Sequence, residues 1–358
     1  MIRNLGPKTL VERVIGVGVL VLVAAGPAIF DDYWVNTILT QTFIFGIAAA
    51  SLIFLFAYGG MISLAQTALM GISAYMLGNM VTQGAPGGET KGLTLGWDPT
   101  LALVLAILGT TAVGLAFGAV ASRSIGIYFL MLTLTYGVIA NYFFGQVTQF
   151  GGFSPIAGIN QYTPGFVGDI VGSPDKLYYI ALGTSVVVYV LIRYIARTPF
   201  GLSLQGVRDD PLRMTSLGFA VPLHRTLAFG FAAFIASLAG ILLAWWDGQI
   251  APGNLGLNAT IELLVICVIG GLARVEGAWL GAFAFIVINN YVRDVELPVV
   301  GGSFNTIIGL IFLAIVIVSP DGLLGIWDRL WRSLGRRDGG PSDVAPTASH
   351  AAPEASSP

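Results

Sequence analysis

The sequence predicts an all-α polytopic membrane protein with about ten transmembrane helices and both termini in the cytoplasm. Three observations predict it: the composition, a series of apolar runs of membrane-spanning length, and arginines confined to one side. Of the 358 residues, 55% are hydrophobic and only 10% are charged, whereas soluble domains carry about 25% charged residues. A water-soluble fold of this length needs a polar shell, which this composition does not supply.

Ten apolar runs approach the roughly 20 residues that a helix needs to cross a bilayer. They cover residues 13–30, 34–57, 61–82, 99–121, 125–147, 177–196, 225–246, 258–273, 276–293 and 303–320. The eighth and ninth runs are short and closely joined, so one or two runs could be re-entrant. The first run follows Arg3, Lys8 and Arg13 and could be a secretory signal. We expect a retained helix, because no small-x-small cleavage site follows.

The basic residues test this count, because cytoplasmic loops of membrane proteins carry an excess of Lys and Arg. With ten spans and a cytoplasmic N-terminus, the outside segments hold only Lys91, Lys176 and Arg293 of the 17 basic residues. The acids of the outside segments are Asp31, Asp32, Glu89, Asp98, Asp169, Asp175, Asp247, Asp294 and Glu296. An odd number of spans would scatter this pattern. We therefore expect a multi-pass membrane protein.

Two regions are predicted along the chain. Residues 1–327 form the membrane domain, and residues 328–358 form an amphipathic anchor that contacts membrane lipid, followed by a disordered tail. Arg329, Arg332 and Arg336 lie on a different face of the anchor from its apolar residues. The apolar face comprises Ile326, Trp327, Leu330, Trp331 and Leu334.

The longest predicted inside loop, residues 197–224, is the most informative stretch. Asp209 or Asp210 is placed to cap a short helix with Pro211 in its first turn, and Gly218 ends that helix. Because a connector could be shorter, a short amphipathic helix here suits docking into a groove on a partner. The alternative is a solvated loop that only obeys the positive-inside rule. The residues that the helix is expected to expose are Arg208, Arg213, Met214 and Leu217.

This loop resembles the coupling loop of binding-protein-dependent ABC importer permeases, in the branched-chain amino acid permease family. The family pattern Gly-x-x-Leu-x-x-Val/Ile-Arg, with a later glycine, is matched by Gly201, Leu204, Val207, Arg208 and Gly218. Met214 stands where alanine is usual in the family. The resemblance implies that the following residues couple the chain to an ATPase: Arg208, Asp209, Asp210, Arg213, Met214 and Gly218.

Five further stretches resemble the same family, in the same order, so that the resemblance covers roughly residues 35–327. Residues 58–75 are similar to the family's Tyr-Gly-Gly-x-x-Ser-Leu-Gly-His stretch, although Ala65 and Gln66 replace Gly-His. The other similar stretches are residues 125–134, 150–158, 262–272 and 319–325, the last with Pro-Asp-Gly-Leu where the family usually has Pro-Arg-Gly-Leu.

The resemblance implies a permease subunit of an ABC importer in the bacterial plasma (inner) membrane that moves branched-chain amino acids by alternating access. It also implies three kinds of partner: a second, homologous permease chain, two ATP-binding cassette subunits, and an extracytoplasmic solute-binding protein that docks on outer loops including residues 148–176. The sequence has no Gly-x-x-x-x-Gly-Lys-Ser/Thr stretch. We therefore expect ATP to be bound by the partner subunits, and no cofactor on this chain.

Other functions stay open at this point. Permeases of the same family move urea or other amides, so such a solute is the first alternative. An ion-coupled secondary transporter usually carries acids near the midplane, which are nearly missing here. We expect neither enzymatic activity nor a metal site, because Cys267 is the single cysteine and the two histidines, His224 and His350, lie outside the apolar runs. We expect no nucleic-acid partner.

Polar residues inside the apolar runs are the candidates for a translocation pathway. Ser63, Gln66, Thr67 and Thr133 place polar groups at depths where they either hydrogen-bond across helices or line a cavity. Gln66 is the strongest candidate, because an amide contacts either charge of a zwitterionic solute. Glu262 is an acid near the outer end of a run, and it either lines the pathway or reaches the outer surface.

Overall fold

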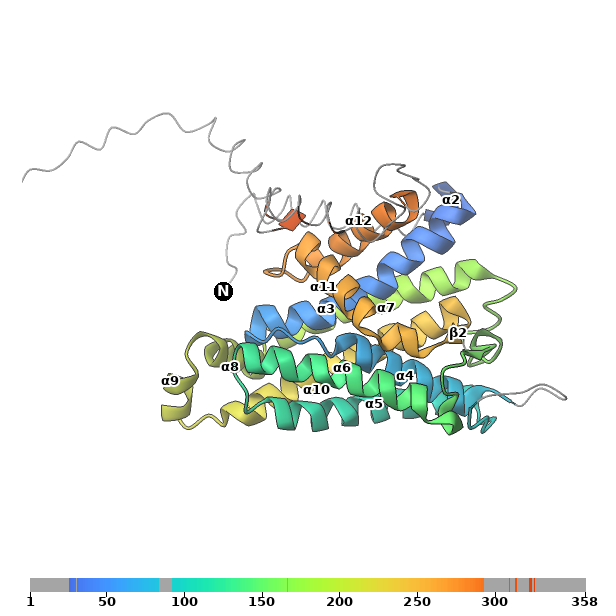
Figure 1. Cartoon of the computed structure of the whole chain (residues 1–358). Helices are drawn as coiled ribbons and strands as arrows, with labels where there is room; N and C mark the ends of the chain where they lie inside the picture. Colours follow the sequence, from blue (N-terminus) through green and yellow to red (C-terminus); the bar gives the residue numbers. More distant parts are fainter. Residues whose placement is uncertain are drawn as a thin grey trace, which may run out of the picture.

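A computed structural model describes residues 26–29, 31–83, 92–165 and 167–292, together with the single positions 309, 313, 322, 323 and 325. This part of the chain is mainly helical, and the long helices run side by side (Figure 1). Of the first predicted run, the structure describes only α2 (Gly26–Ile29). Apart from isolated positions, the tenth run and the predicted anchor and tail lie outside the described residues.

The apolar helices from η1 to α12 correspond to the second to ninth predicted runs, whereas α8 (Pro199–Asp209) and α9 (Pro211–Ser216) belong to none of them. Five segments are long and apolar enough to cross a membrane. They are η1 and α3 (Trp34–Leu39 and Thr40–Gly59), α5 (Pro99–Ala121), α6 (Ile127–Gln146), α7 (Pro174–Ile195) and α10 (Val221–Asp247). Three apolar helices are shorter: α4 (Gln66–Val81), α11 (Leu257–Gly270) and α12 (Gly277–Val292). The 14 residues of α11 extend about 21 Å, less than the roughly 30 Å of a bilayer core.

One end of the helix bundle carries α8 (Pro199–Asp209) and α9 (Pro211–Ser216), which are seen at the left of Figure 1. Arg208 of α8 donates a hydrogen bond to the carbonyl of Ala57 near the end of α3. Arg193 in the last turn of α7 pairs with Glu276 just before α12. We call this the inner end, because the sequence predicts its arginines to face the cytoplasm.

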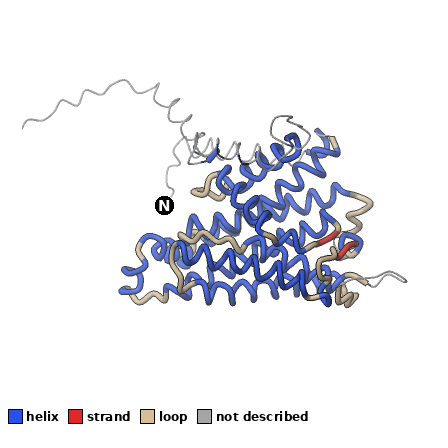
Figure 2. The backbone as a smooth tube through the Cα atoms, in the orientation of Figure 1, coloured by secondary structure: helices blue, strands red, loops and turns tan. Residues whose placement is uncertain are grey.

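The opposite, outer end is closed by a small β-pairing, drawn in red in Figure 2. β1 (Ile156–Ala157) pairs antiparallel with β2 (Gln249–Ile250), and Ile156 lies opposite Ile250. The amide of Ile159 also donates to the carbonyl of Gly248, at 3.1 Å. The loop before α7 is thereby fastened to the end of α10, and its apolar residues Ile156 and Ile159 are buried.

The inner loop holds two helices where the sequence analysis expected one. The sequence analysis named no helix before Asp209, and α8 occupies that stretch. Thr198 caps α8, with its hydroxyl accepting from the amide of Gly201 at 3.4 Å. Leu204 and Val207, three residues apart on one face, are fully buried and hold the helix against the bundle.

The predicted short helix is confirmed as α9. Its capping residue is Asp210, whose side chain accepts from the amide of Arg213 at 3.0 Å. Asp209 instead forms a salt bridge with Arg208. Gly218 follows the helix with φ of +88°, a conformation that residues with a Cβ rarely adopt.

α10 is the central helix, packed against α3, α4 and α5. Small residues let its backbone approach its neighbours closely. A Cβ placed on Gly240 would lie 1.9 Å from the carbonyl oxygen of Met70 and 2.1 Å from Oγ of Ser73, both on α4. Ser73 donates a hydrogen bond across this contact to the carbonyl of Ser237, at 3.0 Å.

Candidate functional site

An exposed apolar surface lies on α9 and the turn after it, beyond the ends of the long helices (Figure 1). Leu212 is 82% exposed and Leu217 is 65% exposed. Arg213 is exposed between them, and Phe219 follows the glycine turn. We call Leu212, Arg213, Leu217 and Phe219 the docking surface. Neighbouring exposed apolar side chains on a projecting helix are typical of an interaction site.

The other predicted coupling residues lie next to this surface, at the end of α8 and on α9. Arg208 contacts Oδ1 of Asp209 through Nε and Nη2, each at 2.8 Å. The same guanidinium donates to the carbonyl of Ala57, which ties α8 to the end of α3. Met214 is only partly exposed, because its side chain lies against Gly206 of α8. Met214 thus joins α9 to α8, and Arg208 joins α8 to α3.

A buried polar cluster joins the short helix α4 to its neighbours. The side-chain oxygen of Gln66 accepts from Ser51 of α3 at 3.0 Å, and its amide nitrogen donates to Ser63 at 3.3 Å. Thr67 hydrogen-bonds to Thr260 of α11 at 2.7 Å. Gln66 and Ser63 are fully buried, and Thr67 is 5% exposed. The contacts with Ser51 and Thr260 cross between helices, as buried polar groups in membranes commonly do.

Thr133 belongs to the same region but has a different task. Its hydroxyl accepts from the backbone amide of Leu64, at 3.1 Å. Leu64 lies in the non-helical segment between α3 and α4, and the next amide, of Ala65, donates to the hydroxyl of Ser63. Irregular backbone at membrane depth is tolerated only where such groups are satisfied by protein. Within this single chain, the structure brings Ser63, Gln66, Thr67 and Thr133 together as packed contacts.

Replacing Gln66 with leucine is expected to lower the free energy of unfolding by about 1 kcal/mol, because Ser51 and Ser63 each lose a buried partner. The single cysteine, Cys267, is fully buried on α11. Labelling of its thiol by a fluorogenic maleimide during heating therefore reports opening of the bundle. Thr135→Val is the control, because the exposed Thr135 bonds only within its own helix, to Met131. Equal unfolding of both variants and wild type would contradict a packing role for Gln66.

Glu262 lies apart from the buried polar cluster. It is in the second turn of α11, towards the outer end, and its side chain is exposed. The residues exposed with it are Leu257, Asn258 and Ile261. A carboxylate facing lipid costs about 2.5–3.5 kcal/mol at the bilayer centre and less towards the interface, where Glu262 lies. This face of α11 therefore favours contact with another polypeptide or with water over contact with lipid.

A charged cluster at the inner end was missed by the sequence analysis. Arg193 pairs with Glu276, and Tyr189 donates its hydroxyl to the same carboxylate at 2.9 Å. Burial raises the pKa of Glu276, but its own amide, the charge of Arg193 and the Tyr189 hydroxyl outweigh burial and hold the pKa below its usual range. One feature of the sequence could have predicted this pair. Arg193 and Glu276 have opposite charges, and both border segments that are predicted to lie inside.

The Glu276→Gln variant is expected to lose about 1 kcal/mol of stability at pH 7. The side chains of Arg193 and Glu276 are 43% and 35% exposed, so the pair is nearer to a surface pair than to a buried one. Because the folded pKa is lowered, the carboxylate stabilises the fold above its unfolded pKa of about 4.3. That contribution is lost as the pH falls through the folded pKa.

Thermal melts at pH 7 and pH 4 measure this difference; they are followed by the fluorescence of the seven tryptophans, because maleimide needs a thiolate, which is scarce at pH 4. The difference in melting temperature between wild type and Glu276→Gln should be smaller at pH 4 than at pH 7. Asp209→Asn is the control, because the Asp209 side chain is 66% exposed and should contribute less. A gap that stays constant with pH would contradict the ion-pair interpretation.

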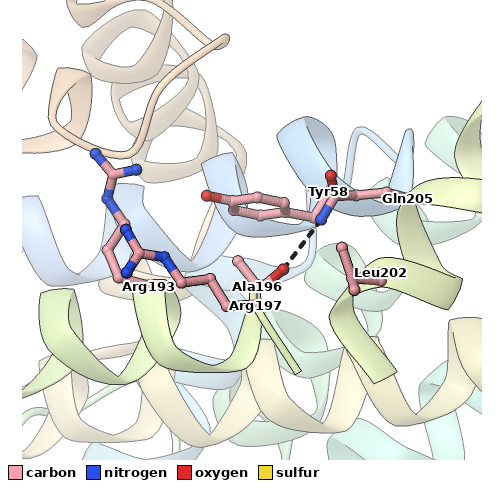
Figure 3. A pocket seen from close by; sticks show the side chains of 6 residues that line it. All are labelled: Tyr58, Arg193, Ala196, Arg197, Leu202 and Gln205. Carbon is pink, nitrogen blue, oxygen red and sulfur yellow. Dashed lines mark hydrogen bonds between the residues drawn. The ribbon is translucent and has the colours of Figure 1, made fainter. Parts of the chain in front are cut away.

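Two pockets accompany these groups. At the inner end, a pocket of about 330 Å³ lies between the ends of α3 and α7 and the start of α8, with the Tyr58 ring pointing towards two arginines (Figure 3). Its lining residues are Tyr58, Arg193, Ala196, Arg197, Leu202 and Gln205. At the outer end, an apolar pocket of about 270 Å³ includes Tyr75, Phe143 and Phe150. Among the described residues, no group of three or more His, Cys, Asp or Glu side chains is placed to hold a metal ion.

Comparison with known proteins identifies the family. Residues 35–319 match the family described as branched-chain amino acid transport system / permease component. The chain is 26% identical to the high-affinity branched-chain amino acid transport system permease protein LivM of Salmonella typhimurium, over 62% of this chain and 56% of that protein. No solved structure matches the chain.

Two further relatives differ in their named substrates. The chain is 30% identical to the autoinducer 2 import system permease protein LsrC of Photorhabdus laumondii, over 41% of this chain and 49% of that protein. It is 30% identical to the high-affinity branched-chain amino acid transport system permease protein BraD of Pseudomonas aeruginosa, over 40% of this chain and 45% of that protein. The chain thus spans about half the length of the curated relatives it matches.

The family match extends from the start of η1 past α12 and includes the inner loop, the buried polar cluster and the charged cluster. It confirms the resemblance drawn from the sequence motifs. The named relatives are transport permeases. The chain therefore belongs to the branched-chain amino acid ABC transporter permease family, whose members are membrane proteins.

Proposed function

We propose that this chain is the transmembrane permease subunit of an ABC importer for branched-chain amino acids in the bacterial plasma membrane. The observation that carries the proposal is the family match across residues 35–319, which includes the projecting helix α9. In this proposal the chain has ten spans with both termini in the cytoplasm. Solute crosses by alternating access, and separate ATPase subunits supply the energy.

The proposal assigns a partner to each exposed surface. The ATPase binds the docking surface on α9. When the ATPase subunits close on ATP, the movement is transmitted through α8 and Arg208 to α3. A second permease chain covers the face of α11 around Glu262, where exposure to lipid would be costly. A solute-binding protein docks at the outer end, where the paired strands β1 and β2 hold the loop before α7 in place.

Glu262 is the pathway candidate that this arrangement favours, because its side chain is exposed on the face assigned to the second chain. The hydroxyl and amide groups of Ser63, Gln66, Thr67 and Thr133 are buried within the chain. In the proposed cycle they line the pathway only if helix movement opens the contacts between α4 and its neighbours. The pathway roles of all five residues remain predictions.

Substrate choice is tested on the solute-binding protein that works with this permease. We expect it to bind leucine, isoleucine or valine at least about a hundredfold more tightly than urea, because burial of three or four methyl and methylene groups is worth roughly 2.5–3 kcal/mol. Autoinducer 2 must be titrated as well, because relatives at about 30% identity include its import permease. Tighter binding of urea or autoinducer 2 would overturn the amino acid assignment and leave the importer assignment in place.

A further inference from the structure

One face of α7 is exposed along its entire length and ends at an arginine. Val187, Val190 and Tyr194 are 62%, 57% and 69% exposed. Arg197 follows at the same helical spacing, and its amide donates to the carbonyl of Tyr194 at 3.0 Å, which continues the helical path. We call this face the α7 stripe; its residues are Tyr179, Gly183, Val187, Val190, Tyr194 and Arg197.

The α7 stripe leads into the pocket at the inner end. Arg197 and Arg193 both line that pocket, together with Tyr58 of α3 and Gln205 of α8 (Figure 3). Gln205 is held in place, since its amide nitrogen donates to the carbonyls of Ala196 and Gly201, each at 3.1 Å. The pocket volume of about 330 Å³ leaves room for a phosphate and part of a glycerol.

The charges around the pocket leave one cation uncompensated. Arg193 is paired with Glu276, and the nearby Arg208 is paired with Asp209. The side chain of Arg197 is exposed and forms no hydrogen bond or ion pair with the part of the chain that the structure describes. Among the residues that the structure describes, the pocket therefore carries a net positive charge, and the guanidinium of Arg197 has the donor geometry that suits a phosphate.

We propose that this pocket binds the phosphate of an anionic glycerophospholipid whose acyl chain lies along the α7 stripe. Basic pockets between membrane helices at the cytoplasmic side bind anionic lipid headgroups in this way. The apolar residues of the stripe would contact an acyl chain, and the arginine at its end would contact the phosphate of the same lipid. A soluble phosphate would contact the arginine but not the stripe. A bound lipid would bridge α3, α7 and α8, and so stiffen the base of the docking surface.

The test uses the full chain, purified in a neutral detergent and titrated with tail-labelled phosphatidylglycerol. Phosphatidylcholine and glycerol phosphate serve as competitors. The variant is Arg197→Gln, and the matched control is Arg123→Gln, because Arg123 is another exposed arginine predicted to lie inside but away from the pocket. Thiol labelling of Cys267 checks that both variants stay folded.

We expect Arg197→Gln to weaken phosphatidylglycerol binding about fivefold, because each basic residue near an anionic surface contributes about 1 kcal/mol. Arg123→Gln should bind as wild type does, and phosphatidylcholine should compete poorly. Equal losses in both variants, or equal binding of the two lipids, would overturn the site. Displacement of the labelled lipid by glycerol phosphate would reassign it to a soluble phosphate. Disulfide-linked dimers of a Val190→Cys chain in the membrane would assign the stripe to a second copy.

Discussion

Replacing Leu212 and Leu217 together with aspartate is expected to reduce ATP-driven uptake by at least about a hundredfold while leaving the chain itself folded. Both leucines are mostly exposed, at 82% and 65%, so their replacement costs the isolated chain little. On docking they would be buried, and each buried leucine contributes about 1.5–3 kcal/mol. The loss of both weakens ATPase binding by more than about 3 kcal/mol, which exceeds a hundredfold.

The measurement is ATPase affinity for the purified chain, followed by uptake in the assembled complex. The control is the Leu212→Met, Leu217→Met double variant, which keeps the apolar surface and its volume and should transport normally. Arg208→Gln provides a second comparison, because it leaves the docking surface intact and removes the link to Ala57. It should retain ATPase binding but transport less solute per ATP. Normal uptake by the double aspartate variant would place the docking site elsewhere.

A single methyl group at Gly240 is expected to destabilise the bundle by about 3 kcal/mol. In Gly240→Ala, the new Cβ would lie 1.9 Å from the carbonyl oxygen of Met70 and 2.1 Å from Oγ of Ser73. Backbone atoms cannot yield as a flexible side chain does, so α4 and α10 must separate. That separation also lengthens the Ser73–Ser237 hydrogen bond, which measures 3.0 Å.

Gly183→Ala is the matched control for this substitution. Gly183 is also a helical glycine, on α7, but a Cβ there meets no atom within 4 Å. Gly183→Ala should therefore leave the free energy of unfolding unchanged or raise it by a few tenths of a kcal/mol, because alanine has a better helix propensity than glycine. Thiol labelling of the buried Cys267 during heating compares the two variants directly. Similar melting of both would show that the α4–α10 contact adapts at little cost.

The apolar runs predicted the eight apolar helical segments that the structure describes, five of them long enough to span a membrane, because hydropathy is a local property that the sequence carries directly. The errors lie at the ends. The run expected over residues 61–82 begins as a helix only at Gln66, since Gly60 takes a φ of +65° and the next residues are not helical. The hydroxyl of Thr133, from a distant helix, satisfies the amide of Leu64 in this stretch. No local sequence pattern predicts that Thr133 is the hydrogen-bond partner of this amide.

The candidate site was predictable in part for the same reason. Asp210, Pro211 and Gly218 carry local capping and turn signals, and the structure has α9 where they place it. The pairing of Arg193 with Glu276 joins segments 83 residues apart, and it depends on how α7 and α12 pack. The contact between Arg208 and Ala57 spans 151 residues. A pattern of exposed and buried residues along one segment does not encode such pairs.

In the proposed function, this chain moves solute only when ATPase subunits drive it. The direct measurement is uptake into liposomes that contain the full chain, its partner permease and both ATPases, with the solute-binding protein and its tightest solute outside. We predict uptake that requires ATP and the binding protein, and that is unaffected by a protonophore or by removal of sodium. Uptake by this chain alone, driven by a proton or sodium gradient without ATP, would contradict the claim.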